Sequence, residues 1–122
     1  MKTSLYTLLP STVHGTQSEN YDGIATEFTG IPFKAAAYYT KNKNLQTVAW
    51  FLDNLEATVY IEATLDEDPN SANYSEIMTL TGTLGAELTE NDWVNIDGNF
   101  TWIRARVVDF NAGQIIKVSL SY

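Results

Sequence analysis

Residues 98–122, GNFTWIRARVVDFNAGQIIKVSLSY, decide the predicted fold because apolar and polar side chains alternate through two consecutive runs. A period of two is typical of a strand with one buried face. The segment DFNAG between the runs is rich in turn-forming residues and holds a glycine that can adopt positive φ. We therefore expect 101–110 and 113–122 to form an antiparallel hairpin, with these side chains facing inward: Ile103, Ala105, Val107, Ile116, Val118, Leu120 and Tyr122.

The middle of the chain repeats this pattern. ATVYIEATLD, at 57–66, alternates strictly, and QTVAWFLD, at 46–53, precedes it. The residues NLE between them favour a turn, so we expect these two strands to be joined by it. Both faces of QTVAWFLD are apolar around Trp50, which indicates that the outer face of this strand is covered as well.

Further strands are predicted on either side of these runs. Pro32 and two tyrosines favour an extended PFKAAAYYT, although its three alanines favour a helix. No segment shows a convincing helical period. The whole pattern predicts an all-β fold, a two-sheet antiparallel β-sandwich that is jelly-roll-like and has about eight strands. The additional strands are ATEFTG at 25–30, PFKAAAYYT at 32–40, SEIMTLTGTL at 75–84 and DWVNID at 92–97.

The first two dozen residues are less periodic and rich in Ser, Thr, Gly and Asn. We expect a strand and arm over 1–30, with one early strand at 6–9 followed by a loop or arm, and a sandwich over 31–122, within a single domain. The start has two sensible placements: it adds a strand to its own sheet, or it reaches a neighbouring copy or a coat protein. We favour the second, because the polar middle of the segment could act as a span. Leu5 and Tyr6 are then contact residues.

Composition excludes several classes of function. The chain has 122 residues, 7 Lys and Arg against 15 Asp and Glu, and a formal net charge of −8, which argues against general nucleic-acid binding. It has no cysteine, so disulfides, cysteine-ligated zinc and thiol catalysis are excluded. Its apolar runs are too short to span a bilayer, and its start lacks the pattern of a signal peptide. We expect no membrane association and no cofactor.

Catalytic groups are scarce, and we expect no enzyme. His14 is the only histidine, and it lies in the polar segment STVHGTQ. Adjacent acids such as Asp66, Glu67 and Asp68 point in different directions and stay solvated, which does not favour an acid–base pair. A calcium site made by Asp66, Asp68 and Asn70 is the alternative interpretation of this loop, and the sequence leaves it open.

Two surfaces are candidates for recognition. The outer face of the closing hairpin carries Trp102, Arg104, Arg106 and Lys117, and thus three of the seven cations. We expect Glu62 or Glu76 to pair with this cluster, either as charge pairing on a solvated face or as part of a docking surface. Aromatic residues are the second candidate, since exposed rings contact sugars. Tyr74 and Trp93 are the possible glycan contacts.

The segment LQTVAWFLDNLEATVYIEATLDEDP, followed by Tyr74 in SANYSEI and by the closing run GNFTWIRARVVDFNAGQIIKVSLSY, resembles a β-sandwich domain of virion proteins in tailed bacteriophages. The resemblance covers roughly 35–122. A more distant likeness links the chain to discoidin-like, sugar-binding jelly rolls. The turn TLDEDPN lacks the glycine of their pattern.

The phage resemblance implies a structural protein of the virion. Such a protein decorates the capsid or joins the neck, tail or fibres, and its partners are other virion proteins and further copies of itself. The likeness to sugar-binding jelly rolls implies the alternative function, a carbohydrate-binding module that attaches the particle to host surface glycans.

Overall fold

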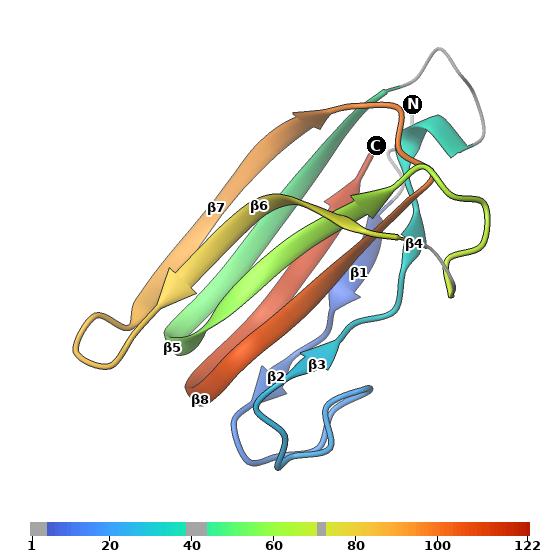
Figure 1. Ribbon diagram of the computed structural model, residues 1–122. Helices are drawn as coiled ribbons and strands as arrows, with labels where there is room; N and C mark the ends of the chain where they lie inside the picture. Colours follow the sequence, from blue (N-terminus) through green and yellow to red (C-terminus); the bar gives the residue numbers. More distant parts are fainter. Residues whose placement is uncertain (1–4, 39–43, 71–72) are drawn as a thin grey trace.

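The computed structural model describes residues 5–38, 44–70 and 73–122, and the fold is all β, as predicted. Its eight strands form one antiparallel sheet (Figure 1), so the predicted division into two sheets, and with it a jelly roll, is not confirmed. A single 3₁₀ turn, η1, follows β4. The elements are β1 (Leu5–Leu9), β2 (Thr12–Val13), β3 (Phe28–Thr29), β4 (Phe33–Lys34), η1 (Ala36–Tyr38), β5 (Leu45–Thr64), β6 (Ser75–Gly82), β7 (Leu88–Asp97) and β8 (Trp102–Ser121).

The sheet is organised around its two longest strands, β5 and β8, which pair with each other along nearly their whole length. The short strands β1, β2, β3 and β4 follow one another along the outer edge of β8. β6 and then β7 run in the same way along the outer edge of β5. Each edge is therefore built from strands that succeed one another along a single long neighbour.

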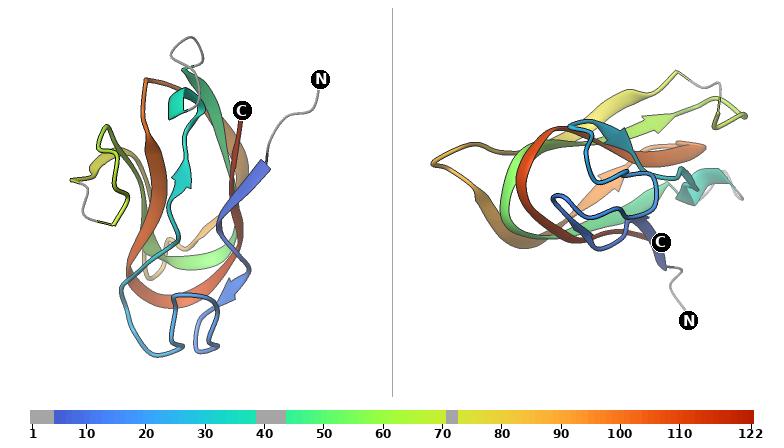
Figure 2. Two further views of the ribbon diagram at one scale, coloured as in Figure 1. Left: turned by 90° about the vertical axis from the view of Figure 1, so that its right-hand side faces the viewer. Right: turned by 90° about the horizontal axis from the view of Figure 1, so that it is seen from below.

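This one sheet folds over on itself. Figure 2 shows β5 and β8 as U-shaped ribbons, so that the two ends of each strand lie in two facing layers. We call the first the β7 layer: β7, residues 45–52 of β5, residues 115–121 of β8, and β1. The second is the β6 layer: β6, residues 57–64 of β5, residues 102–108 of β8, β3 and β4. The apolar faces of the layers cover each other, which gives a core without a second sheet.

The bend is made by residues with positive φ. Asn54 in β5 has a φ of 49°, and Asp109 and Gly113 in β8 have φ values of 52° and 94°. The register between β5 and β8 shifts on both sides of Glu56, as expected of β-bulges. A Cβ atom on Gly113 would collide with the backbone oxygen of Asn54, so only glycine fits between the bent strands.

The segments NLE and DFNAG therefore do not form the predicted hairpin turns. Each continues through the middle of one long strand, because Asn, Asp and Gly at positive φ produce a bulge as readily as a turn. The prediction that 101–110 pairs with 113–122 is wrong: both belong to β8, and both pair with β5.

The inward side chains of β8 follow the prediction except at one position. Ile116 is 45% exposed, and Ile115 is fully buried in its place, because the register shifts opposite Phe51 and Leu52. Tyr122 packs against the core, where its ring stacks on Tyr6 and its hydroxyl donates a hydrogen bond to a backbone oxygen of β4. The predicted residues that are buried are Ile103, Ala105, Val107, Val118 and Leu120.

The start of the chain belongs to its own sheet. β1 and β2 pair with β8, and Leu8 and Leu9 are buried in the core together with Tyr21 and Phe28. The interpretation of this segment as an arm that reaches another protein is thus wrong for the described residues from Leu5 onward. The predicted strand at 6–9 is confirmed as β1.

The other predicted strands are recovered with changed limits. The runs at 25–30, 75–84 and 92–97 correspond to β3, β6 and β7. PFKAAAYYT is extended only at Phe33–Lys34 and then forms η1, with Ala35 and Ala36 buried, so its alanines do follow their helical preference. Residues 39 and 40 of this prediction lie outside the described part of the chain.

Candidate functional site

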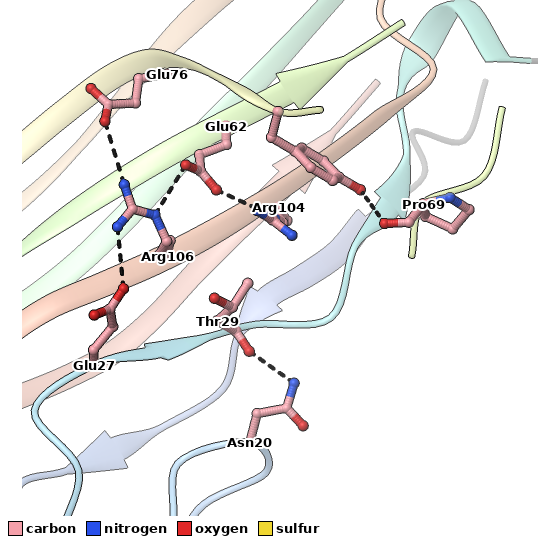
Figure 3. A network of polar contacts seen from close by, with 9 residues as sticks. Asn20, Glu27, Thr29, Glu62, Pro69, Glu76, Arg104 and Arg106 are labelled. Atoms are coloured by element: carbon pink, nitrogen blue, oxygen red, sulfur yellow. Dashed lines mark hydrogen bonds and ion pairs between the residues drawn. The ribbon is translucent and has the colours of Figure 1, made fainter. Parts of the chain in front are cut away.

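An ion-pair cluster occupies the outer face of the β6 layer. Glu62 of β5 lies opposite Arg104 of β8, and Tyr60 lies opposite Arg106. Arg104 Nε donates to Glu62 Oε1 at 2.9 Å, and Arg106 Nε donates to Glu62 Oε2 at 3.1 Å (Figure 3). Only 5% of Glu62 is exposed, although it points outward. The expected cross-strand pairing is confirmed, with a buried carboxylate at its centre.

The two arginines have further partners. Arg106 also contacts Glu27 and Glu76, each at 3.4 Å, and the hydrogen bond that it donates to Glu62 raises the pKa of its guanidinium above the usual value. Arg104 lies 3.7 Å above the ring of Tyr74. Each cation is thus matched by groups of the same chain, which favours a bracing role for the cluster over attraction of an acidic partner.

Trp102 belongs to the same face, and it anchors the loop between β5 and β6. Its indole nitrogen donates to the backbone oxygen of Glu67 at 2.9 Å, and its ring meets the edge of Tyr38. Tyr74 fixes the loop from the other side, because its hydroxyl donates to the backbone oxygen of Pro69. Burial is the main cause that raises the pKa of Tyr74.

The other predicted contact residues lie elsewhere. Lys117 is in the β7 layer, opposite Phe51, with its amine 6.0 Å from the centre of that ring. Leu5 is 62% exposed on β1, whereas Tyr6 points inward against Phe33. The six residues predicted as an assembly surface therefore do not form one surface.

The two predicted glycan contacts are also apart. Tyr74 precedes β6 and lies under Arg104, at the far end of the β6 layer. Trp93 is in β7, paired with Ala49, and it is 61% exposed. Since they lie in different layers, they cannot contact the same sugar ring.

His14 and the acidic loop have structural partners. The ring of His14 meets the edge of Phe110 at 5.3 Å between centroids. Asp66 Oδ2 accepts a hydrogen bond from the backbone of Asn73, and Asp68 Oδ1 accepts one from the backbone of Asn70. Within 5–38, 44–70 and 73–122, no three His, Cys, Asp or Glu side chains gather in a way that would hold a metal ion. Nothing in the described loop supports the calcium alternative.

A further surface lies on the outer face of the β7 layer, and it includes the outer side of QTVAWFLD, which the sequence predicts to be covered. Two rows of paired residues cross β1, β8, β5 and β7, and none of their side chains is charged. The sequence predicts that Ser119 and Ser121 point outward. It does not predict which residues of the other strands lie beside them, because that depends on pairing between distant segments. We call these residues the neutral face: Leu5, Thr7, Thr47, Ala49, Trp93, Asn95, Ser119 and Ser121.

Large apolar side chains stand at the margins of the neutral face. Leu5 and Trp93 stand exposed at its two edges, and Leu45 is exposed beside it on β5. Between them the side chains are small, and Thr47 donates a hydrogen bond to Asn95 at 2.7 Å. A small, uncharged centre between two exposed apolar groups suits close contact with another protein surface.

The described part of the chain holds no helix that is long and apolar enough to cross a membrane. Comparison with protein-family models, with curated proteins and with solved structures finds no match to this chain.

Proposed function

We propose that this protein is a structural subunit of a tailed-phage virion, which decorates the capsid or joins the neck, tail or fibres and binds a further copy of itself through the neutral face. The virion assignment rests on the sequence resemblance of 35–122. The assembly role is carried by one structural observation: a chain with a net charge of −8 keeps two full rows of one sheet face free of charge.

Charge is the reason to expect a second copy there. Two copies of a chain with this net charge repel each other, and the repulsion is weakest at a face that carries no charge of its own. The neighbouring rows hold one acid, Asp97, and one cation, Lys117. At the centre of the neutral face, Ala49 is half-buried and Ser119 is only 4% exposed, and their small side chains allow close approach of another sheet. Trp93 and Leu5 then supply the large apolar groups that carry most of the energy of such contacts.

The contact is tested by placing one charge in the neutral face. Ala49→Glu points outward and leaves the core untouched. Thr79→Glu is its control, because Thr79 is an exposed, outward-facing residue of β6 in the other layer. Sedimentation over a concentration series should show self-association of the wild type and of Thr79→Glu, and a monomer for Ala49→Glu. Association of Ala49→Glu as tight as that of the wild type would refute the neutral face as the contact.

The virion assignment needs a separate measurement. Purified particles from an infection should contain the chain in many copies by mass spectrometry, and they should lose it when the Ala49→Glu gene replaces the natural one. A chain that is produced in the infected cell but missing from purified wild-type particles would overturn the assignment.

A further inference from the structure

A pocket of about 330 Å³ opens at the end of the β6 layer. Its lining residues come from the end of β5, the start of β6 and the segment 98–101 that leads from β7 to β8. Figure 1 shows the course of these backbone segments. Its volume is at the small end of the range for ligand sites in proteins. The side chains that matter for its chemistry are Thr64, Leu65, Asp66, Asn73, Ser75 and Phe100.

Hydrogen bonds hold the walls of this pocket in place. Thr101 Oγ1 donates to the backbone oxygens of Thr64 and Asp66, at 3.0 and 2.6 Å, and so ties the β7–β8 segment to the end of β5. The backbone of Asp66 donates to Thr64 Oγ1, and the carboxylate of Asp66 receives the backbone N–H of Asn73. A site whose walls are already fixed loses little conformational entropy when a ligand binds.

Phe100 supplies an aromatic wall. Its ring lies directly over Gly98, where a Cβ atom would come within 2.5 Å of a ring carbon. Glycine at this position therefore lets the ring lie close against the backbone. With Leu65 beside it, the ring gives the pocket an apolar side suited to the C–H face of a small ring compound.

The opposite side is polar and has unused hydrogen-bonding capacity. Among the described residues, the second carboxylate oxygen of Asp66, the side-chain amide of Asn73 and the hydroxyl of Ser75 have no protein partner. They offer an acceptor, an amide that both donates and accepts, and a hydroxyl. This set matches the hydroxyl groups of a polyol, which also donate and accept.

Charge narrows the class of ligand. The pocket contains a carboxylate and no cation among its lining residues, and Glu67 and Asp68 follow directly in the chain. An anion would be repelled, while a metal ion would find one carboxylate, too few for a cation site. We propose that this pocket binds one neutral sugar ring of a glycan, with Phe100 against its C–H face and with Asp66, Asn73 and Ser75 on its hydroxyls. The site is independent of the neutral face and adds an activity to the proposed assembly role.

Nuclear magnetic resonance titration of the full chain tests this proposal. The probes are the methyl glycosides of glucose, galactose and N-acetylglucosamine, with N-acetylneuraminic acid as the charged comparison. At least one neutral glycoside should shift the backbone amides of 64–66, 73–75 and 98–101, and the charged sugar should not. Shifts confined to the surroundings of Trp93, or none from any neutral glycoside at millimolar concentration, would overturn the site.

Two variants and a control assign the effect to the pocket. Asp66→Asn keeps an oxygen for the backbone of Asn73 but loses the charge, and Asn73→Ala removes the amide; each should weaken binding about tenfold or more, as expected when a charge-assisted or amide hydrogen bond is lost. Asp68→Asn is the matched control, since its carboxylate caps the same loop without lining the pocket. Unchanged affinity in both pocket variants would refute the proposal. Ala49→Glu should bind the sugar normally, so failure here is distinct from failure of the assembly contact.

Discussion

Replacing Glu62 by glutamine is the sharpest test of what holds the outer face of the β6 layer together. The side chain keeps its size, but one carboxylate that receives Arg104 at 2.9 Å and Arg106 at 3.1 Å becomes a neutral amide. The amide oxygen can accept from one arginine only, and the amide nitrogen then faces the other. Arg104 and Arg106 project from the same side of β8, and the replacement removes the negative charge of Glu62 that lies between them.

The cost follows from the number and exposure of these bonds. A hydrogen bond between charged groups contributes about 1.5–3 kcal/mol and a neutral one about 0.5–1.5 kcal/mol, so the loss before screening is about 3 kcal/mol. The side chains of Arg104 and Arg106 are 27% and 25% exposed, and Arg106 retains Glu27 and Glu76. Solvent and these remaining acids reduce the expected loss in the free energy of unfolding to about 2 kcal/mol. For a domain of this size that corresponds to a fall in melting temperature of roughly 6–10 °C.

Urea denaturation and calorimetry measure this change, and Glu76→Gln is the matched control. Glu76 contacts the same guanidinium at 3.4 Å, but its side chain is 49% exposed, so its replacement should cost less than about 0.5 kcal/mol. A Glu62→Gln protein within about 0.5 kcal/mol of the wild type, or equal effects of the two replacements, would show that burial of Glu62 does not set the strength of the cluster.

Four further predictions concern the fold. Val118→Asp buries an unpaired charge and should cost about 4 kcal/mol or more in urea denaturation, whereas Ile116→Asp, at the exposed bulge, should cost less than about 1 kcal/mol; the reverse order would contradict the register. Gly113→Ala should cost about 3 kcal/mol or more, because alanine is strained at this φ and its Cβ collides with the backbone of β5. Deletion of residues 1–16 removes β1 and β2, and circular dichroism should show that the remaining chain is unfolded. A folded monomer would instead support the interpretation of this segment as an arm. Because the pKa of Tyr74 is raised in the folded state, its contribution to the free energy of unfolding is fully present below pH 10 and is lost as the pH rises through the folded pKa. The Tyr74→Phe protein should therefore lose less stability than the wild type between pH 9 and pH 11. Equal losses in the two proteins would contradict the last of these.

Local pattern was enough to predict the class of fold and most of its buried positions. The alternation through Val59 and Ile61, and again through Ile103 and Val107, identifies the inward side chains, because a strand presents every second residue to one face. The pattern also predicted the pairing of the arginines with Glu62, since opposite charges on the outward phase of neighbouring strands attract. These features depend only on residues close in sequence or on generic strand pairing.

The neutral face and the sugar pocket could not be predicted in the same way. Ser119, Ala49 and Trp93 are ordinary outward residues until the pairing of β8, β5 and β7 places them in one row. Phe100 and Asp66 come from separate connecting segments, and no motif links such segments in the sequence. The ring of Tyr74 lies against Arg104 and its hydroxyl donates to the loop backbone, and its contact with a glycan stays a prediction.

The length of the alternating segments also indicates that they must bend. β5 and β8 each have 20 residues, and a straight strand of that length spans ~66 Å. A compact domain of 122 residues is only ~35 Å across, so each segment has to reverse direction near its middle. A hairpin and a folded-over sheet both satisfy this requirement, and both use Asn, Asp and Gly at the reversal.

The two solutions differ in where the reversals must lie. Two hairpins can turn at unrelated positions along their strands. Two strands that stay paired through a bend must exchange their inward and outward residues at positions that lie opposite each other. The inward phase of β5 changes between Leu52 and Leu55, and that of β8 first changes between Val107 and Phe110. These positions meet across the sheet, where Glu56 pairs with Ala112. Both phase changes occur near the middle of segments of equal length, and that coincidence favours one folded sheet over two independent hairpins.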